Sequence, residues 1–423
     1  MAHNTTNGLK LLGVLIRYNR NQKGLSLRQL AKLSNMSHTL ISTIETGKVI
    51  PNKDTLRDIF DVLNIDFYDS DVLEDDFYQL SNKLKNHLFN YEFDEAENIA
   101  NVLFKHENKY ENSPLLIDYI LVKYLYLVLP SNPTINYDAQ LKTLETIYEY
   151  LTNEQKQMWQ FIKGMNYINT RRFKQATEYL LKARKLGDHK ITPFINAFLT
   201  YTYVHRYMYM DAIEIGRKTI LQLEKDMNYK WAMEVRLTQG KAFSLVRRFN
   251  KAKAIYDQVR KFCSQFDVPG LLSKCNLYTA EMYHRSNDLE SARFFIEQID
   301  KRGLYYYYSA FHIYGKLGEK EKVKTLYQEI QKHPDYKHSY RTRLITSIMY
   351  RMFIKGDQTS KEYAKQLEEL LNIAIKGEQQ ETIELVSELL IQYYSEKRQY
   401  KNAFIYCEKA YKIRRYGIGI LSE

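Results

Sequence analysis

The side chains best suited to hydrogen bonding with another molecule are concentrated near the start of the chain. Residues 37–43 bring together Ser37, His38, Thr39, Ser42 and Thr43. Hydroxyl and imidazole groups can each donate and accept hydrogen bonds. These residues do not have the spacing of a catalytic or metal-binding motif. The segment is therefore expected to bind a partner rather than to carry out a reaction.

The charge around this segment is strongly asymmetric. Residues 1–53 contain eight Lys or Arg residues and one acid, Glu45, whereas residues 54–76 contain nine acids and one base, Arg57. The whole chain of 423 residues has a net charge of +12. A uniformly charged surface would not separate in this way, and clustered cations favour a polyanionic partner. The sequence predicts a basic domain at 1–70 followed by an acidic connector at 71–76.

Four short helices are expected to position these residues. The predicted helices run over 10–21, from 26 onward, over 37–45 and over 54–63. Ser26 with Gln29 forms a capping box at the start of the second helix, and Ser37 is a suitable N-cap for the third. Asn35 suits the left-handed turn between the second and third helices. Leu30 and Leu33 are expected to be the buried residues of the second helix.

Segment 24–52, GLSLRQLAKLSNMSHTLISTIETGKVIPN, resembles the lambda-repressor-like, or XRE-type, helix-turn-helix family. The resemblance covers about residues 10–66. It rests on Leu30-Ala31, Ser37, Ile41, Glu45, Gly47 and Pro51. In this family the third helix enters the major groove of DNA. The resemblance therefore implies double-stranded DNA as a partner.

The resemblance also assigns roles to individual residues. It implies contacts with base edges from Ser37, His38, Thr39, Ser42 and Thr43, and contacts with phosphates from Ser26, Arg28 and Lys48. His38 and Thr39 are the strongest candidates for base recognition. Arg20 and Glu45 match a structural ion pair and are assigned to the scaffold. Leu27 replaces a Gln that often touches the DNA backbone in this family, so that contact is not expected.

The remainder of the chain, 77–423, is expected to be built from helical repeats. The seven prolines fall between apolar-periodic segments, and no alternating strand pattern is sustained. Segments 164–183 and 240–259 share the residue spacing of tetratricopeptide repeats. Further copies are expected around Ala212, Ala292, Ala96, Val323, Ala364 and Ala403, with a degenerate copy around 115–151. The sequence predicts an all-α fold with about nine helical hairpins in a right-handed superhelix.

The first helices of such hairpins line a concave face. Polar and aromatic residues expected there include Tyr201, His205, Lys241, Glu281, His284, Arg285, Tyr305 and Tyr308. A face of this kind is suited to an extended peptide. For each single residue, an ordinary solvated position in the repeats is favoured over a ligand contact.

The combination of the two regions resembles the peptide-pheromone receptors of low-GC Gram-positive bacteria, which include the Rgg, PlcR, PrgX and NprR types. That resemblance implies a homodimeric transcription regulator of the quorum-sensing kind, controlled by a short imported peptide. Asn169 and Asn196 are the nearest matches to the Asn residues that hold the peptide backbone in such receptors. Two alternatives remain open. One is an adaptor whose repeats bind a response regulator or another protein, and the other is a repressor of a phage or mobile element.

Other features point to a non-enzymatic protein of the cytoplasm. The three cysteines form no CxxC pair, the N-terminus has no secretory pattern, and no apolar run is long enough for a membrane span. No common nucleotide-binding, hydrolase or metal-binding motif occurs in a suitable context. We therefore expect no catalytic residues, no metal and no cofactor.

Overall fold

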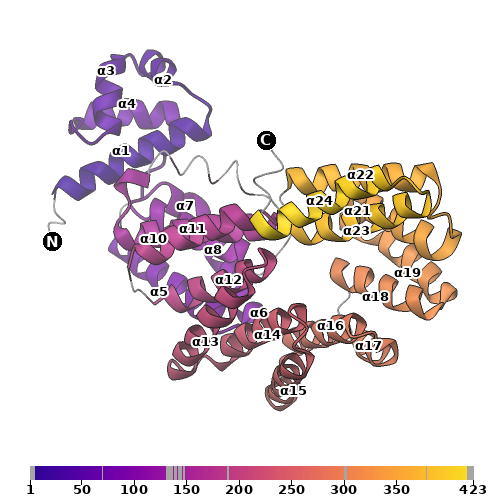
Figure 1. Cartoon of the computed structure of the whole chain (residues 1–423). Helices are drawn as coiled ribbons and strands as arrows, with labels where there is room; N and C mark the ends of the chain where they lie inside the picture. The colour runs from indigo at the N-terminus through magenta and orange to yellow at the C-terminus, as the bar shows by residue number, and fades with distance from the viewer. Residues whose placement is uncertain are drawn as a thin grey trace. The chain divides into compact units, whose positions relative to one another are not determined.

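The computed structural model describes residues 5–68, 70–129, 137, 141, 145, 148–187, 190–299, 303–377 and 379–416. Within these ranges the regular structure is helical and contains no strand, as the sequence predicted (Figure 1). The chain forms two compact units. The first is Met1–Thr170 with Glu178–Ile195, and the second is Arg171–Thr177 with Asn196–Glu423. No helix in the described ranges has the length and apolarity needed to cross a bilayer.

The N-terminal helices are α1 (Thr5–Gln22), α2 (Leu27–Leu33), α3 (His38–Glu45) and α4 (Lys53–Leu63). The four predicted helices are thus present, and α1 is longer than expected. Their shared core contains apolar side chains exposed by 2% or less: Val14, Leu15, Ile16, Leu30, Ile41, Ile44, Ile59 and Leu63. The basic N-terminal segment therefore folds around its own apolar core.

One expected core residue is not buried. Leu33 is 57% exposed, so the expectation that it packs inward was wrong. The buried face of α2 runs through Leu30, Ala31 and Ser34, and Leu33 falls outside that face of the helix. Ser34 is accommodated because its Oγ donates to the Leu30 carbonyl at 2.8 Å.

Caps and turns fix where these helices begin. Ser26 and Gln29 form the predicted capping box at α2. Asn35 has the predicted left-handed backbone, with φ of 53°. Ser37 caps α3, and Asn52, which the sequence analysis did not single out, caps α4 through its side-chain oxygen. Each cap satisfies a backbone N–H that a helix start would otherwise leave unpaired.

The predicted acidic connector at 71–76 is itself helical. It forms the first turns of α5 (Asp71–Phe89), where Asp71 and Glu74 lie at the positive end of the helix dipole. The chain reaches α5 after Tyr68, whose backbone N–H donates to the Asn112 carbonyl at 3.0 Å. The acidic residues at 71–76 therefore belong to a helix and do not form an irregular linker.

The helices that follow are arranged as consecutive hairpins. Up to residue 185 they are α6 (Phe93–Phe104), α7 (Glu107–Glu111), α8 (Leu116–Val128), η1 (Tyr148–Tyr150), α10 (Asn153–Asn169) and α11 (Phe173–Lys185). The next are α12 (Thr192–His205), α13 (Tyr209–Lys225), α14 (Tyr229–Leu245), α15 (Phe249–Phe266), α16 (Pro269–Arg285) and α17 (Leu289–Ile296). The last are α18 (Leu304–Leu317), α19 (Lys320–Lys332), α20 (Pro334–His338), α21 (Tyr340–Tyr350), η2 (Arg351–Lys355), α22 (Lys361–Lys376), α23 (Gln380–Glu396) and α24 (Tyr400–Tyr416).

The predicted repeat anchors occupy one equivalent position. Each is the fourth residue of the second helix in its hairpin and is exposed by 7% or less. They are Ala96, Ala176, Ala212, Ala252, Ala292, Val323, Ala364 and Ala403. A small residue here lets the two helices of a hairpin approach closely. The degenerate copy around 115–151 extends outside the described residues, so the number of nine and the handedness remain predictions.

Seven hairpins share a left-handed residue two positions before the second helix begins. Its φ lies between 57° and 75° in Tyr91, Arg171, Tyr207, Arg247, Asn287, Gly318 and Arg398. Left-handed backbone is strained for residues with a Cβ. Six of the seven residues are not glycine, so we attribute the conformation in those six to packing of the two helices of each hairpin.

Candidate DNA interface and ligand site

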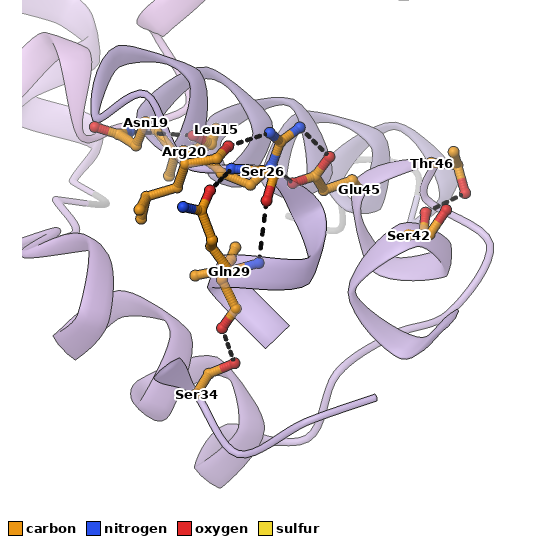
Figure 2. Close-up of polar contacts among 11 residues, drawn as sticks. Leu15, Asn19, Arg20, Ser26, Gln29, Ser34, Ser42, Glu45 and Thr46 are labelled. Carbon is orange, nitrogen blue, oxygen red and sulfur yellow. Dashed lines mark hydrogen bonds and ion pairs between the residues drawn. The ribbon is translucent and has the colours of Figure 1, made fainter. Parts of the chain in front are cut away.

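Helix α3 is held in place by a buried ion pair with α1. Arg20 Nε donates to Glu45 Oε1 at 2.6 Å and Nη2 donates to Oε2 at 3.0 Å, with the two side chains 9% and 4% exposed (Figure 2). Arg20 Nη1 also donates to the Leu25 carbonyl at 2.7 Å. Both residues are fully engaged inside the domain, so their assignment to the scaffold is confirmed.

Close backbone contact reinforces this arrangement. A Cβ added at Gly13 would lie 2.5 Å from the Ile44 carbonyl oxygen and 2.8 Å from that of Glu45. Only a residue without a side chain permits this approach of α1 to the end of α3. The orientation of α3 is thus fixed by contacts on its inner side.

The residues assigned to DNA contact lie on α2 and α3 or at their ends: Ser26 and Ser37 directly precede the two helices, and Lys48 follows α3. Ser26, Arg28, Ser37, His38, Thr39 and Lys48 are exposed, and Ser42 and Thr43 are half-buried. Three of these hydroxyl groups also form hydrogen bonds with the backbone of α2 and α3. Ser26 Oγ accepts from the Gln29 N–H, Ser37 Oγ accepts from the Leu40 N–H, and Thr43 Oγ1 donates to the Leu40 carbonyl. Their roles toward DNA remain predictions.

The residues predicted to contact a peptide all lie on the first helix of a hairpin. Asn169 is in α10; Asn196, Tyr201 and His205 are in α12; Lys241 is in α14; Glu281, His284 and Arg285 are in α16. The placement on first helices agrees with the sequence analysis. Whether these residues bind a ligand remains a prediction.

Two of the eight are engaged in internal packing. Asn169 is 5% exposed, and its Nδ2 donates to the Val128 carbonyl at 3.0 Å. His205 is 4% exposed and stacks on Phe173 with ring centroids 4.5 Å apart and planes 9° apart. These contacts occupy the Asn169 amide N–H and one face of the His205 ring within the protein.

The others lie among charged and aromatic neighbours. Lys241 is 6% exposed, with Nζ 4.9 Å from the Tyr278 ring centroid. Glu281 accepts from Ser309 Oγ at 3.1 Å and lies 3.7 Å from the Arg285 guanidinium. Lys241 and Glu281 are therefore already held by protein groups, and a ligand would have to share them.

Several first helices carry buried acceptors without a donor. Asn196 Oδ1 in α12, Glu234 Oε2 in α14 and Asn276 Oδ1 in α16 are buried, and no described residue donates to them. Asn276 as a whole is 2% exposed. An unsatisfied buried polar group costs about 1–3 kcal/mol. A ligand rich in N–H groups, such as a peptide backbone, would offset that cost.

The second unit also contains a cluster of tyrosines and cations, which we call the tyrosine–cation cluster. Its members are Arg171, Tyr201, Lys274, Tyr278, Tyr305, Tyr308 and Arg341. Arg171 Cζ lies 4.4 Å from the Tyr305 ring centroid, and Lys274 Nζ lies 5.9 Å from the Tyr201 and Tyr278 centroids. Burial raises the pKa of Tyr201 and Tyr278 well above that of free tyrosine. The phenols are therefore neutral hydrogen-bonding groups at physiological pH.

Comparison with known proteins assigns the N-terminal region. Residues 16–69 match the family model described as helix-turn-helix. These residues form a helix-turn-helix domain. The chain is also 40% identical, over 57 residues, to the ImmF control region 10 kDa protein of Bacillus phage phi105. That match covers 14% of this chain and 63% of the phage protein, so the chain spans less than two thirds of this relative.

The repeat region has the fold of two groups of solved proteins. A Rap protein complexed with competence and sporulation factor has a TM-score of 0.66 at 13% identity, covering 81% of this chain and 98% of that one. The quorum sensor NprR complexed with its cognate peptide NprX has a TM-score of 0.59 at 17% identity, covering 80% and 98%. Apo NprR from B. thuringiensis has a TM-score of 0.58 at 16% identity, covering 81% and 99%. These likenesses establish a shared helical-repeat fold.

Sequence reasoning missed four members of the tyrosine–cation cluster: Arg171, Lys274, Tyr278 and Arg341. Arg171 stands in a hairpin turn, and its distance in sequence from Tyr305 gives no indication that they meet. Tyr305 and Tyr308 were expected on the concave face but were not distinguished from the many other tyrosines. The pattern of first-helix positions across hairpins would have been the one usable indication of Arg341.

Proposed function

We propose that this protein is a DNA-binding transcription regulator whose activity is controlled by a short signalling peptide bound by its repeats. The observation that carries the proposal is the set of buried unpaired acceptors, Asn196 and Asn276 above all, on the first helices of a repeat region attached to a helix-turn-helix domain. A peptide supplies backbone N–H groups, which are the donors that these acceptors lack.

The DNA end of the proposal rests on α3. Its N-terminal residues His38 and Thr39 are exposed, while its inner side is fixed by the Arg20–Glu45 pair. Helices presented in this way read base edges in the major groove. We propose that the protein acts as a homodimer in the cytoplasm and binds two half-sites of an inverted repeat.

The peptide end is supported by what similar proteins bind. Solved structures show the Rap protein with competence and sporulation factor and NprR with the peptide NprX. Identity to both is below 20%, so the shared fold supports a comparable ligand but does not identify it.

Control of DNA binding requires that the peptide favour one conformation over another. Helix α5 begins a few residues after the end of α4. The backbone hydrogen bond from Tyr68 to Asn112 connects the segment between α4 and α5 to the first repeats. We propose that peptide binding changes the packing of successive hairpins and that α5 carries the change to the helix-turn-helix domain.

The proposal is tested by isothermal titration of the full chain with the mature peptides encoded by small reading frames beside its gene. Saturable binding that weakens in Asn276→Leu but not in Asn169→Leu is the expected result. The second variant is a matched control, because its amide already pairs with Val128. Absence of binding by every candidate would contradict the peptide-controlled reading.

The second candidate function is a protein-interaction adaptor. The exposed aromatic side chains of the last helix, Tyr400, Phe404 and Tyr411, offer a surface for a large partner. If variants of His38 and Thr39 still capture a defined response regulator in a pull-down, this candidate is favoured. If these variants lose both DNA binding and capture of the response regulator, the result counts against it.

A further inference from the structure

Arg341 is a largely buried cation that has no acidic partner in the described chain. It lies in α21; its Nη2 donates to Thr382 Oγ1 of α23 at 3.0 Å, and its Nε is buried without an acceptor. A guanidinium has five N–H donors, and carboxylates match two of them at once. A neutral hydroxyl therefore satisfies only part of the Arg341 side chain.

Two other partly buried arginines of the same unit have carboxylate partners. Arg236 Nη2 donates to Glu224 Oε1 at 2.6 Å, and Arg293 Nη1 donates to Glu319 Oε1 at 3.0 Å. A buried charge without a counter-charge destabilises a folded protein. Arg236 and Arg293 thus have carboxylate partners, whereas no described carboxylate pairs with Arg341.

The neighbours of Arg341 increase the positive potential. Burial, together with the nearby charge of Arg171, lowers the pKa of Arg341 to about 10. The side chain still carries its charge at neutral pH, and Arg171 adds a second positive charge. A single negative group between the two guanidinium groups would be attracted to both.

Aromatic hydroxyls complete the surroundings. Tyr305 and Tyr308 lie close enough to influence Arg341, and the ring of Tyr305 also lies against Arg171. Tyr305 is 37% exposed, so the cluster meets solvent at this residue. Phenolic O–H groups donate hydrogen bonds to carboxylates. Cations, neutral donors and partial exposure together describe a site for an anion.

We propose that Arg341, with Arg171 and the Tyr305 and Tyr308 hydroxyls, forms a subsite for a carboxylate of the bound peptide. This inference rests on the proposed function and adds a chemical requirement for its ligand. The carboxylate is either the C-terminus of the peptide or an Asp or Glu side chain. In both cases the bidentate geometry of Arg341 orients the peptide along the first helices.

The test uses three synthetic pools of short peptides, matched in length, on the immobilised full chain. The first has free C-termini and no Asp or Glu, the second has C-terminal amides with Asp or Glu, and the third has amides without acids. Mass spectrometry of retained peptides is the readout. Retention of peptides from the first pool indicates that the subsite binds the C-terminal carboxylate. Retention of peptides from the second pool indicates that it binds an Asp or Glu side chain. Peptides of the third pool are not expected to be retained.

The best-retained peptide is then titrated into variants. Arg341→Gln should bind it about ten- to a hundredfold more weakly, the loss expected for a charge-assisted hydrogen bond. Arg236→Gln, whose parent residue is paired with Glu224, is the matched control and should bind as the wild type does. Equal retention of the third pool, or undiminished binding by Arg341→Gln, would overturn the subsite and leave peptide control standing. Failure of every pool to bind would remove both.

A measurement without ligand distinguishes loss of the subsite from poor folding of a variant. Arg341→Met removes an unpaired buried charge and is expected to raise the thermal midpoint of the full chain, whereas Arg236→Met, which strands Glu224, is expected to lower it. A lower midpoint for Arg341→Met would indicate that the guanidinium stabilises the free protein, which contradicts a site awaiting an anion.

Discussion

The imidazole rings of His284 in α16 and His312 in α18 lie 6.1 Å apart between consecutive hairpins. Burial and the nearby charge of Lys316 lower the pKa of His284 to about 3 and that of His312 to about 4. Both rings are therefore neutral at physiological pH. Protonation of either would place a charge in an interface that already contains cations.

This pair predicts a pH dependence of stability. In the unfolded chain the two histidines titrate near pH 6.5. Between that value and about pH 4 the unfolded state binds more protons than the folded state, so the free energy of unfolding decreases as pH falls. Urea unfolding at pH 7 and pH 5 should show a smaller decrease in His312→Gln than in the wild type.

Lys316→Met provides an independent check on the same pair. Removing the neighbouring charge raises both folded-state pKa values toward 6.5 and should also reduce the acid-induced loss. If His312→Gln and Lys316→Met lose as much stability as the wild type between pH 7 and pH 5, the neutral pair does not govern this dependence.

A second prediction concerns the ion pair behind α3. Glu45→Gln leaves Arg20 buried without a counter-charge and should destabilise the helix-turn-helix domain by roughly 3–5 kcal/mol. Hydrogen exchange of α1–α4 amides in the full chain measures the local effect. Arg57→Ala, which breaks the exposed pair with Asp54, is the control and should change protection little. Comparable effects from the two variants would contradict a scaffold role for Glu45.

The left-handed hairpin turns provide a third prediction. Arg247 has φ of 59° in the turn between α14 and α15, whereas Gly318 has φ of 75° between α18 and α19. Arg247→Gly relieves backbone strain and should stabilise the protein by about 0.5–1 kcal/mol, while Gly318→Ala should destabilise it by about 1–2 kcal/mol. Denaturant midpoints measure both. Destabilisation by Arg247→Gly would indicate that side-chain contacts of Arg247 outweigh the strain.

A fourth prediction separates base reading from phosphate contact. Thr39→Ala should cost about 1–3 kcal/mol on the preferred operator and relax selectivity at one base pair. Lys48→Ala should weaken binding to all sequences and reduce the salt slope by about one. Operators selected from random duplexes and titrated at several salt concentrations give both quantities. An unchanged salt slope in Lys48→Ala would remove that residue from the phosphate contacts.

Local patterns predicted much of this structure from sequence. The small residue at the fourth position of each second helix and the cap at Ser37 depend on neighbours within one hairpin or one turn, and both were recognisable. Leu33 was misassigned because its exposure depends on which face of a seven-residue helix meets the core.

The ligand site was less accessible to sequence reasoning. Arg171 and Tyr305 are in contact although they are far apart in the chain. Whether an acidic residue lies beside Arg341 depends on the helices packed around it, not on the residues next to it in sequence. The left-handed turns were also not predicted, since Arg and Tyr occupy positions where glycine would have been the usual indication. Long-range packing decides the first two features, and packing of the two helices within a hairpin decides the third.

The most direct test of peptide control is a closed thermodynamic cycle on the full chain. The dissociation constant of the selected operator is measured with and without saturating peptide, and that of the peptide with and without operator. Peptide control of DNA binding predicts that both constants change by the same factor, at least about fivefold, because coupling between two sites is reciprocal. An operator affinity that is identical with and without bound peptide would contradict it.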